Sequence, residues 1–143
     1  LYRSPRSHVE LGLDTVARRR VILKSVDRRH ESAVARLCHE AAMLRELSTL
    51  QIAPALFDVV EGPERVYLVE EDLGARSLDQ LLMPPERGAP LQARKMAALV
   101  ERVCSCVARL HAAGYVHGDI KPANLILDEA ERVRFLDLES VVR

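Results

Sequence analysis

Three polar residues near the C-terminal end of the sequence have a spacing that suits a site for charged groups. Asp119 and Asn124 lie in the run HGDIKPAN at positions 117–124, and Asp137 follows thirteen positions after the Asn. Transfer of a phosphoryl group needs one carboxylate to meet the incoming hydroxyl, and further oxygen ligands to hold Mg²⁺ against the phosphates. Asp119, Asn124 and Asp137 would supply those three groups in that order.

Two short strands are expected to position these residues. Residues 125–127 (Leu-Ile-Leu) and 133–136 (Val-Arg-Phe-Leu) are short runs typical of strands, and the acidic segment Asp128-Glu129-Ala130-Glu131 between them suits a turn. Asn124 and Asp137 would then stand at strand ends. A hairpin at this place would bring their side chains together.

A long helix is expected before the HGDIKPAN run. Between Leu91 and Ala113 apolar residues recur at steps of three and four, and Gly114 would end the helix. Its buried face is expected to hold Met96, Leu99, Val103, Val107 and Leu110. Further upstream, Gly74 is expected to interrupt regular structure, and Ser77 would cap a short helix that extends through Leu82. Residues 83–90 are expected to form a loop. This region suits a linker between two lobes.

The N-terminal half is expected to be a sheet with one helix. Residues 9–14 and 21–26 are typical of a hairpin, and residues 55–61 and 66–70 of two more strands, separated by a turn at Gly62-Pro63. Between the two pairs, a helix is expected from Asp27 to about Leu50. The apolar stripe on its buried face consists of Val34, Leu37, Ala41, Leu44 and Leu47, and Glu40 lies beside this stripe.

Composition limits the class of protein. The chain has 143 residues, of which 48% are hydrophobic and 29% charged, as in a soluble globular domain. Its 21 basic residues balance its 21 acidic ones, so no overall field favours nucleic acid or an anionic membrane. No apolar run approaches the ~20 residues of a membrane span. We therefore expect a cytoplasmic protein, and the start at Leu1 and end at Arg143 suggest a piece of a larger multidomain one.

The three cysteines, Cys38, Cys104 and Cys106, are an odd number without metal-type spacing. We interpret them as small apolar helix residues in a reducing compartment. They carry no functional prediction.

The order of these features resembles the eukaryotic-type protein kinase family, in its bacterial Ser/Thr form. The features occur along the whole chain in a fixed order: a lysine on a strand, a glutamate on a helix, a linker, a long helix, and then the cluster of Asp, Asn and Asp. The resemblance implies an α+β fold of two lobes: a small lobe of antiparallel strands with one helix at 1–73, and the first part of a helical large lobe at 74–143. ATP and Mg²⁺ would be the cofactors.

The resemblance also implies a role for single residues. Lys24, in Val21-Ile22-Leu23-Lys24, looks like the lysine that contacts the α- and β-phosphates and pairs with a helix glutamate, here Glu40. Asp119 would be the catalytic carboxylate, and Lys121 would lie near the γ-phosphate. Asn124 and Asp137 would be the magnesium ligands.

The nucleotide base would be met by other residues. Glu71 and Leu73 would offer backbone groups to the adenine, and Val9 would lie on the strand that leaves the phosphate cover. Glu70 would stand at the back of the same pocket, where a buried carboxylate needs a partner that the sequence does not identify.

The chain departs from the family pattern at several positions. Gly118 replaces the usual Arg, which makes control by activation-loop phosphorylation doubtful, and Glu139 replaces the usual third-place Gly, which stiffens the turn. The glycine positions of the phosphate cover are Tyr2, Ser4 and Ser7. His117 is expected to be a packed structural residue.

The resemblance favours an ATP-dependent protein kinase domain that phosphorylates a Ser or Thr hydroxyl on a protein substrate. Gly118 and Glu139 also agree with small-molecule kinases resembling the aminoglycoside and choline phosphotransferases, while Lys121-Pro122 argues for protein substrates. Kinase domains of lanthionine-forming synthetases share this mixture. A pseudokinase that serves only as a binding module is the third reading.

Overall fold

The computed structural model describes residues 7–74, 76–82 and 93–143. The chain divides into two compact units, Leu1–Asp72 and Leu73–Arg143. The sequence positions Tyr2 and Ser4 and the predicted loop at 83–90 lie outside the described residues. In the described part, no helix is both long enough and apolar enough to cross a membrane.

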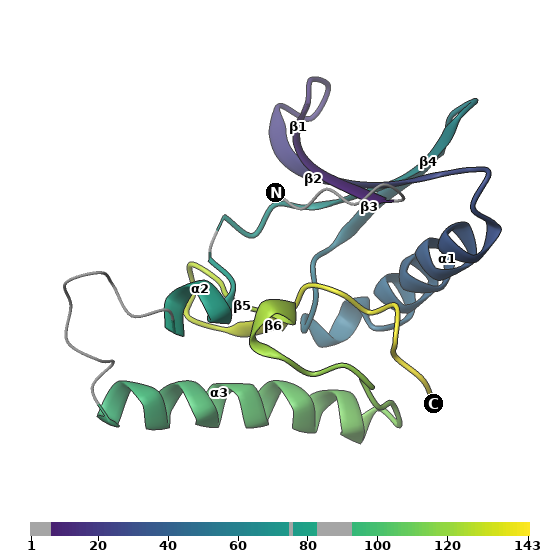
Figure 1. Cartoon of the computed structure of the whole chain (residues 1–143). Helices are drawn as coiled ribbons and strands as arrows, with labels where there is room; N and C mark the ends of the chain where they lie inside the picture. The colour runs from purple at the N-terminus through teal and green to yellow at the C-terminus, as the bar shows by residue number, and fades with distance from the viewer. Residues whose placement is uncertain (1–6, 75, 83–92) are drawn as a thin grey trace. The chain divides into compact units, whose positions relative to one another are not determined.

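The first unit is built on a four-stranded antiparallel sheet (Figure 1). Its strands are β1 (Ser7–Asp14), β2 (Arg19–Asp27), β3 (Leu56–Glu61) and β4 (Arg65–Glu71), in the spatial order β1-β2-β4-β3. Both predicted strand pairs are therefore confirmed. The β1–β2 turn closes because the Asp14 carboxylate accepts the backbone N–H groups of Val16 and Ala17.

The central ladder joins β2 to β4, which are far apart in the sequence. Lys24 stands opposite Leu68, and Ile22 opposite Glu70. Along β4 the buried residues alternate with partly exposed ones, and the buried row is Val66, Leu68 and Glu70. The third position of an otherwise apolar row is thus a glutamate.

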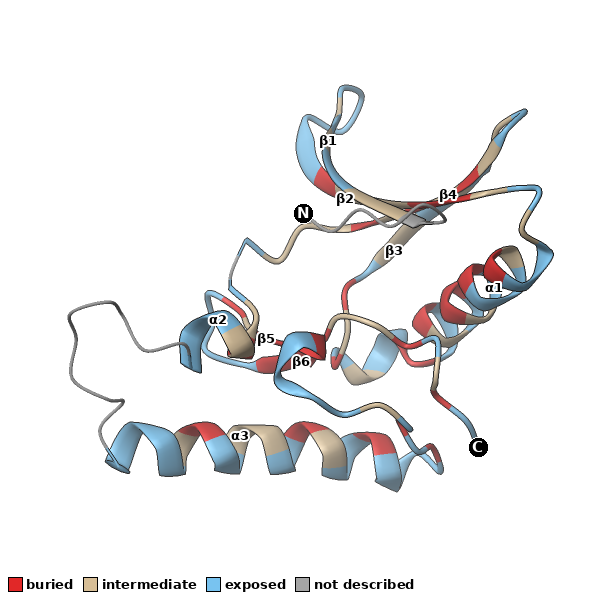
Figure 2. Cartoon of the chain, in the orientation of Figure 1, coloured by how far each residue is buried: buried red, intermediate tan, exposed pale blue. Residues whose placement is uncertain are grey.

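Helix α1 (Glu31–Glu46) lies along one face of this sheet, in contact with β2, β3 and β4 (Figure 1). It begins later than the predicted Asp27 because that residue ends β2, and its carboxylate accepts the N–H of Arg29. A short 3-10 turn, Ser48–Leu50, follows the helix. Figure 2 shows the buried stripe of α1, made of Ala33, Leu37, Glu40, Ala41 and Leu44.

The second unit contains two helices and a small hairpin. Helix α2 spans Leu78–Leu82 and helix α3 spans Ala93–Ala112. Gly114 follows α3 with φ +85°, and its N–H donates to the carbonyl of His111 at 2.9 Å, so the predicted glycine stop is confirmed. The buried residues of α3 are Leu99, Cys106 and Leu110, whereas Met96 is exposed.

The hairpin is formed by β5 (Leu125–Leu127) and β6 (Val133–Phe135), directly after the 3-10 turn Pro122–Asn124. Phe135, Leu138 and Val141 are fully buried around it. The hairpin predicted from the two short strand-like runs is confirmed, and it holds the polar residues of the HGDIKPAN run next to an apolar core.

Candidate functional site

Lys24 and Glu40 form a close ion pair in the first unit. The Lys24 Nζ atom lies 2.5 Å from Oε1 of Glu40, and the two side chains are 17% and 6% exposed. Lys24 belongs to the middle of β2, and Glu40 follows Leu37 on the buried stripe of α1. The pair therefore joins the sheet to the helix that packs on it.

Glu70 is a second acidic neighbour of Lys24. Its Oε2 atom lies 3.3 Å from the Lys24 Nζ, and its side chain is 2% exposed. This contact identifies the partner that the sequence left open. The signal in the sequence was the alternation Val66, Leu68, Glu70, which points Glu70 inward, but only the β2–β4 register brings Lys24 beside it.

Asp119, Lys121 and Asn124 form a second cluster, in the other unit. The Lys121 ammonium donates to Asp119 Oδ2 at 2.6 Å, and the Asn124 amide donates to the same oxygen at 2.9 Å and to the Asp119 carbonyl at 3.0 Å. The hydrogen bond from Lys121 lowers the pKa of Asp119, and the same contact raises the pKa of Lys121. Asp119 is therefore an ionised carboxylate at neutral pH.

His117 lies inside the core of this unit. Its ring is buried, packs against Phe135 with the ring centroids 4.4 Å apart and the planes tilted by 37°, and accepts the N–H of Asp119 on Nδ1 at 3.4 Å. Burial lowers the pKa of His117, against opposing contributions from Asp137 and Asp119. A buried, packed ring that holds the Asp119 backbone agrees with the structural role predicted for it.

Gly118 adopts a conformation that L side chains rarely adopt, with φ +76°. An added Cβ would lie 2.7 Å from the carbonyl oxygen of Ser140. Close by, Val116 and Val142 exchange backbone hydrogen bonds of 2.8 and 2.9 Å. The local backbone thus requires glycine where the family usually has Arg, and sequence reasoning did not find this requirement.

Asp137 follows β6 by two residues and is partly exposed. Its Oδ1 atom accepts the backbone N–H of Glu139 at 2.9 Å, which forms a tight Asx turn in which Glu139 is exposed. The hairpin also joins Asn124 to Leu136, whose N–H donates to the Asn124 carbonyl at 2.9 Å. Asn124 itself is buried, with 9% of its surface exposed.

The residues predicted to meet the base occupy strand and linker positions. Val9 lies on β1 opposite Lys24. Glu71 ends β4, and its N–H donates to the carbonyl of Ala55 at 2.9 Å, while its carboxylate accepts the N–H of Ala55. Leu73 is the first residue of the second unit.

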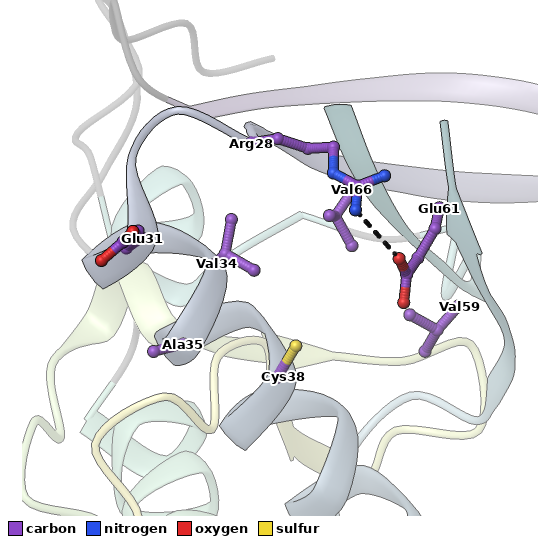
Figure 3. Close-up of a pocket in the computed structure, with 8 residues that line it drawn as sticks. All are labelled: Arg28, Glu31, Val34, Ala35, Cys38, Val59, Glu61 and Val66. Carbon is purple, nitrogen blue, oxygen red and sulfur yellow. Dashed lines mark hydrogen bonds and ion pairs between the residues drawn. The ribbon is translucent and has the colours of Figure 1, made fainter. Parts of the chain in front are cut away.

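A pocket of about 350 Å³ opens elsewhere on the first unit (Figure 3). It is lined from α1 by residues that include Val34 and Cys38, and from the sheet by Val59 and Val66. None of the predicted site residues lines this pocket, so its position does not identify a nucleotide site.

Comparison with known proteins agrees with the features of both units. A sequence profile described as "Protein kinase domain" matches residues 6–142. The serine/threonine-protein kinase PknL of Mycobacterium tuberculosis is 31% identical over 134 residues, which are 92% of this chain and 33% of that protein. Maternal embryonic leucine zipper kinase of Xenopus laevis is 26% identical over 130 residues, 90% of this chain and 19% of that protein.

The chain belongs to the protein kinase domain family, as its motifs predicted. It spans a third or less of the length of these curated relatives. The antiparallel sheet with one helix corresponds to the small lobe of the kinase fold, and the second unit to the start of its large lobe.

Proposed function

We propose that the chain is part of an ATP-dependent protein kinase that transfers the γ-phosphoryl group to a Ser or Thr hydroxyl. The observation that carries this proposal is the Asp119 cluster, in which one carboxylate is held ionised and oriented by Lys121 and Asn124. A carboxylate fixed in this way can align a hydroxyl for attack on phosphorus. Family membership supports the same reaction class.

The roles that we propose for the lysines follow from the negative charge of the nucleotide phosphates. Lys24 would bind the α- and β-phosphates, and Glu40 would hold its ammonium in place. Lys121, which already lies against Asp119, would bring a positive charge to the transferred group. Val9, Glu71 and Leu73 would meet the nucleotide base and sugar.

Asn124 and Asp137 fit a magnesium site by the chemistry of their donors. Both offer hard oxygen atoms, which Mg²⁺ prefers, and Asn124 donates through Nδ2 to Asp119, so its amide oxygen is left to accept. Within the described residues, no three His, Cys, Asp or Glu gather into a metal-binding group. Two protein ligands would suffice, because Mg²⁺ usually takes phosphate oxygens and water molecules as its other ligands. The bound ion would neutralise negative charge on the phosphates.

Protein hydroxyls are proposed as acceptors for two reasons. The relative PknL is named as a serine/threonine-protein kinase. This chain also carries Lys121-Pro122 in the HGDIKPAN run, a pair of residues that argues for protein substrates. We also propose a cytoplasmic location, where ATP is available and free thiols such as Cys38 and Cys104 stay reduced.

The proposal is tested by phosphoryl transfer from labelled ATP in the full-length protein, with a generic Ser/Thr protein substrate and phosphoamino-acid analysis. Asp119→Asn should reduce transfer by at least about a thousandfold and leave ATP binding intact, whereas Lys24→Met should weaken both. Glu61→Gln is the control, since Glu61 is exposed and pairs only with Arg28 among the contacts described (Figure 3). Transfer by Asp119→Asn at the wild-type rate would refute the assignment.

The same experiment separates the alternatives. Label on a small alcohol, with none on protein, would indicate a small-molecule kinase. ATP binding without transfer to any acceptor would indicate a binding module.

A further inference from the structure

Lys24 has two buried acidic neighbours, where one would suffice to hold it. Its Nζ atom is 2.5 Å from Glu40 and 3.3 Å from Glu70. Both carboxylates are almost fully removed from solvent, with side chains 6% and 2% exposed. Such removal is costly for an ionised group, so each carboxylate depends strongly on the charge beside it.

The two acidic residues reach Lys24 from different elements. Glu40 comes from α1, while Glu70 comes from β4, the strand hydrogen-bonded to β2. Lys24 is directly opposite Leu68, so Glu70 is its diagonal neighbour two residues further on, on the same face of the sheet. The contact between Lys24 and Glu70 is therefore built into the sheet and does not depend on where the helix lies.

The charges of these three side chains do not balance. One ammonium between two carboxylates leaves a net charge of −1 when all three are ionised. A phosphate arriving at Lys24 adds more negative charge at the same ammonium, and Coulomb repulsion in a poorly hydrated site is stronger than in water. Glu70 consequently opposes any anion that Lys24 would bind.

We propose that Glu70 competes with nucleotide phosphates for Lys24 and so sets the nucleotide affinity of this domain, an inference that rests on the proposed phosphate-binding role of Lys24. Glu40 holds the lysine between helix and sheet, while Glu70 is an internal anion that the phosphates must outweigh. Glu70 is thus a positioning residue, acting on the nucleotide through Lys24.

The test is Glu70→Gln in the full-length protein, which keeps the size and an oxygen acceptor but removes the charge. We expect the Kd for ATP with Mg²⁺, measured by titration calorimetry, and the KM for ATP to fall by roughly tenfold, with kcat changed by less than about twofold. Glu70→Leu, which also removes the charge, should tighten binding too. Glu61→Gln removes an exposed carboxylate of the same sheet and should leave both constants unchanged.

A merely structural role for Glu70 predicts a different result. Both neutral variants would then lower the unfolding temperature and leave ATP binding unchanged or weaker, which would overturn the competition. Lys24→Met separates this failure from that of the proposed function. If the wild type binds ATP and Lys24→Met does not, but Glu70→Gln fails to bind more tightly, only the competition is wrong. If neither the wild type nor Glu70→Gln binds ATP, both proposals are wrong.

Discussion

The backbone at Gly118 lies so close to the carbonyl oxygen of Ser140 that a Cβ at position 118 would be 2.7 Å from it. The positive φ of Gly118 adds a second reason why a side chain is excluded. The absence of Arg between His117 and Asp119 is therefore a packing requirement of this unit. An arginine could be placed there only if the segment around Ser140 moved.

Replacement of Gly118 is expected to destabilise the second unit. Gly118→Ala should lower the free energy of unfolding by about 2–4 kcal/mol, because it combines an unfavourable φ with a clash against backbone. Urea denaturation monitored by circular dichroism measures the change.

Gly114→Ala is a matched control for the clash. Gly114 also has a positive φ, of +85°, but an added Cβ would meet nothing within 4 Å. Its cost should be about 1 kcal/mol, from the backbone conformation alone. Equal costs at the two positions would show that the contact with Ser140 does not matter.

Loss of the Lys24 charge should destabilise the first unit more than loss of a surface ion pair. Lys24→Met leaves Glu40 and Glu70 buried without this ammonium, and we expect a cost of about 3 kcal/mol in urea unfolding. Adding Glu70→Leu should recover about 1–2 kcal/mol, since one of the two buried carboxylates is removed. Arg28→Met breaks the exposed pair with Glu61 and an exposed hydrogen bond to the Gly62 carbonyl, and it should cost no more than about 1 kcal/mol. No recovery in the double variant would mean that Glu70 does not depend on Lys24.

Asp128 should make the second unit sensitive to acid. Burial works against its ionised form, but hydrogen bonds from the backbone and side chain of Arg132 outweigh burial and hold the pKa of Asp128 below its usual 3.8. A lowered folded-state pKa stabilises the fold above the unfolded-state pKa, and this stabilisation is lost as the pH falls through the folded-state pKa.

We therefore expect Asp128→Asn to cost about 1–3 kcal/mol at pH 7, because the buried guanidinium of Arg134 also loses a nearby carboxylate. The difference from wild type should shrink as the pH is lowered from about 5 towards 3. Unfolding curves for both proteins across this range measure it, and a constant difference at all pH values would contradict the prediction.

The three cysteines should react at different rates with a thiol reagent. Cys38 and Cys104 are exposed, whereas Cys106 is buried in α3, and burial raises the pKa of the Cys106 thiol to about 11. At pH 8 only about 0.1% of that thiol would be thiolate even if the reagent reached it. Ellman's reagent should thus modify two thiols of the folded protein quickly and the third only slowly, and the slow thiol should gain reactivity when the pH rises or denaturant is added. Fast modification of all three in the folded protein would contradict this burial.

Local patterns in the sequence predicted most of the elements. The strand-like runs at 55–61 and 66–70, separated by the turn residues Gly62-Pro63, indicated the β3–β4 pair, and the steps of three and four indicated α1 and α3. These signals suffice because strand and helix periodicity depend on neighbouring residues. The start of α1 was misplaced because the side chain of Asp27 forms a turn with Arg29, which hydrophobic periodicity does not register.

The candidate site was predictable as a set of residues, but its contacts were not. The partner of Glu70 depends on the register between β2 and β4, and no local pattern sets which residue of one strand faces which of the other. The glycine requirement at Gly118 depends on Ser140, more than twenty positions later. The roles assigned to Asp119, Lys121 and Asn124 remain predictions, although these three side chains do gather.

The spatial order β1-β2-β4-β3 has a consequence for how the first unit folds. The β1–β2 and β3–β4 pairs connect through short turns and can form early, whereas the β2–β4 ladder must close a long loop that contains α1. Closing this loop lowers the chain entropy before the contacts of the ladder stabilise the fold. Pairing of this kind is therefore slow. We therefore expect Lys24 to contact Glu70 only when that ladder forms, which is the step that commits the whole unit to its native topology.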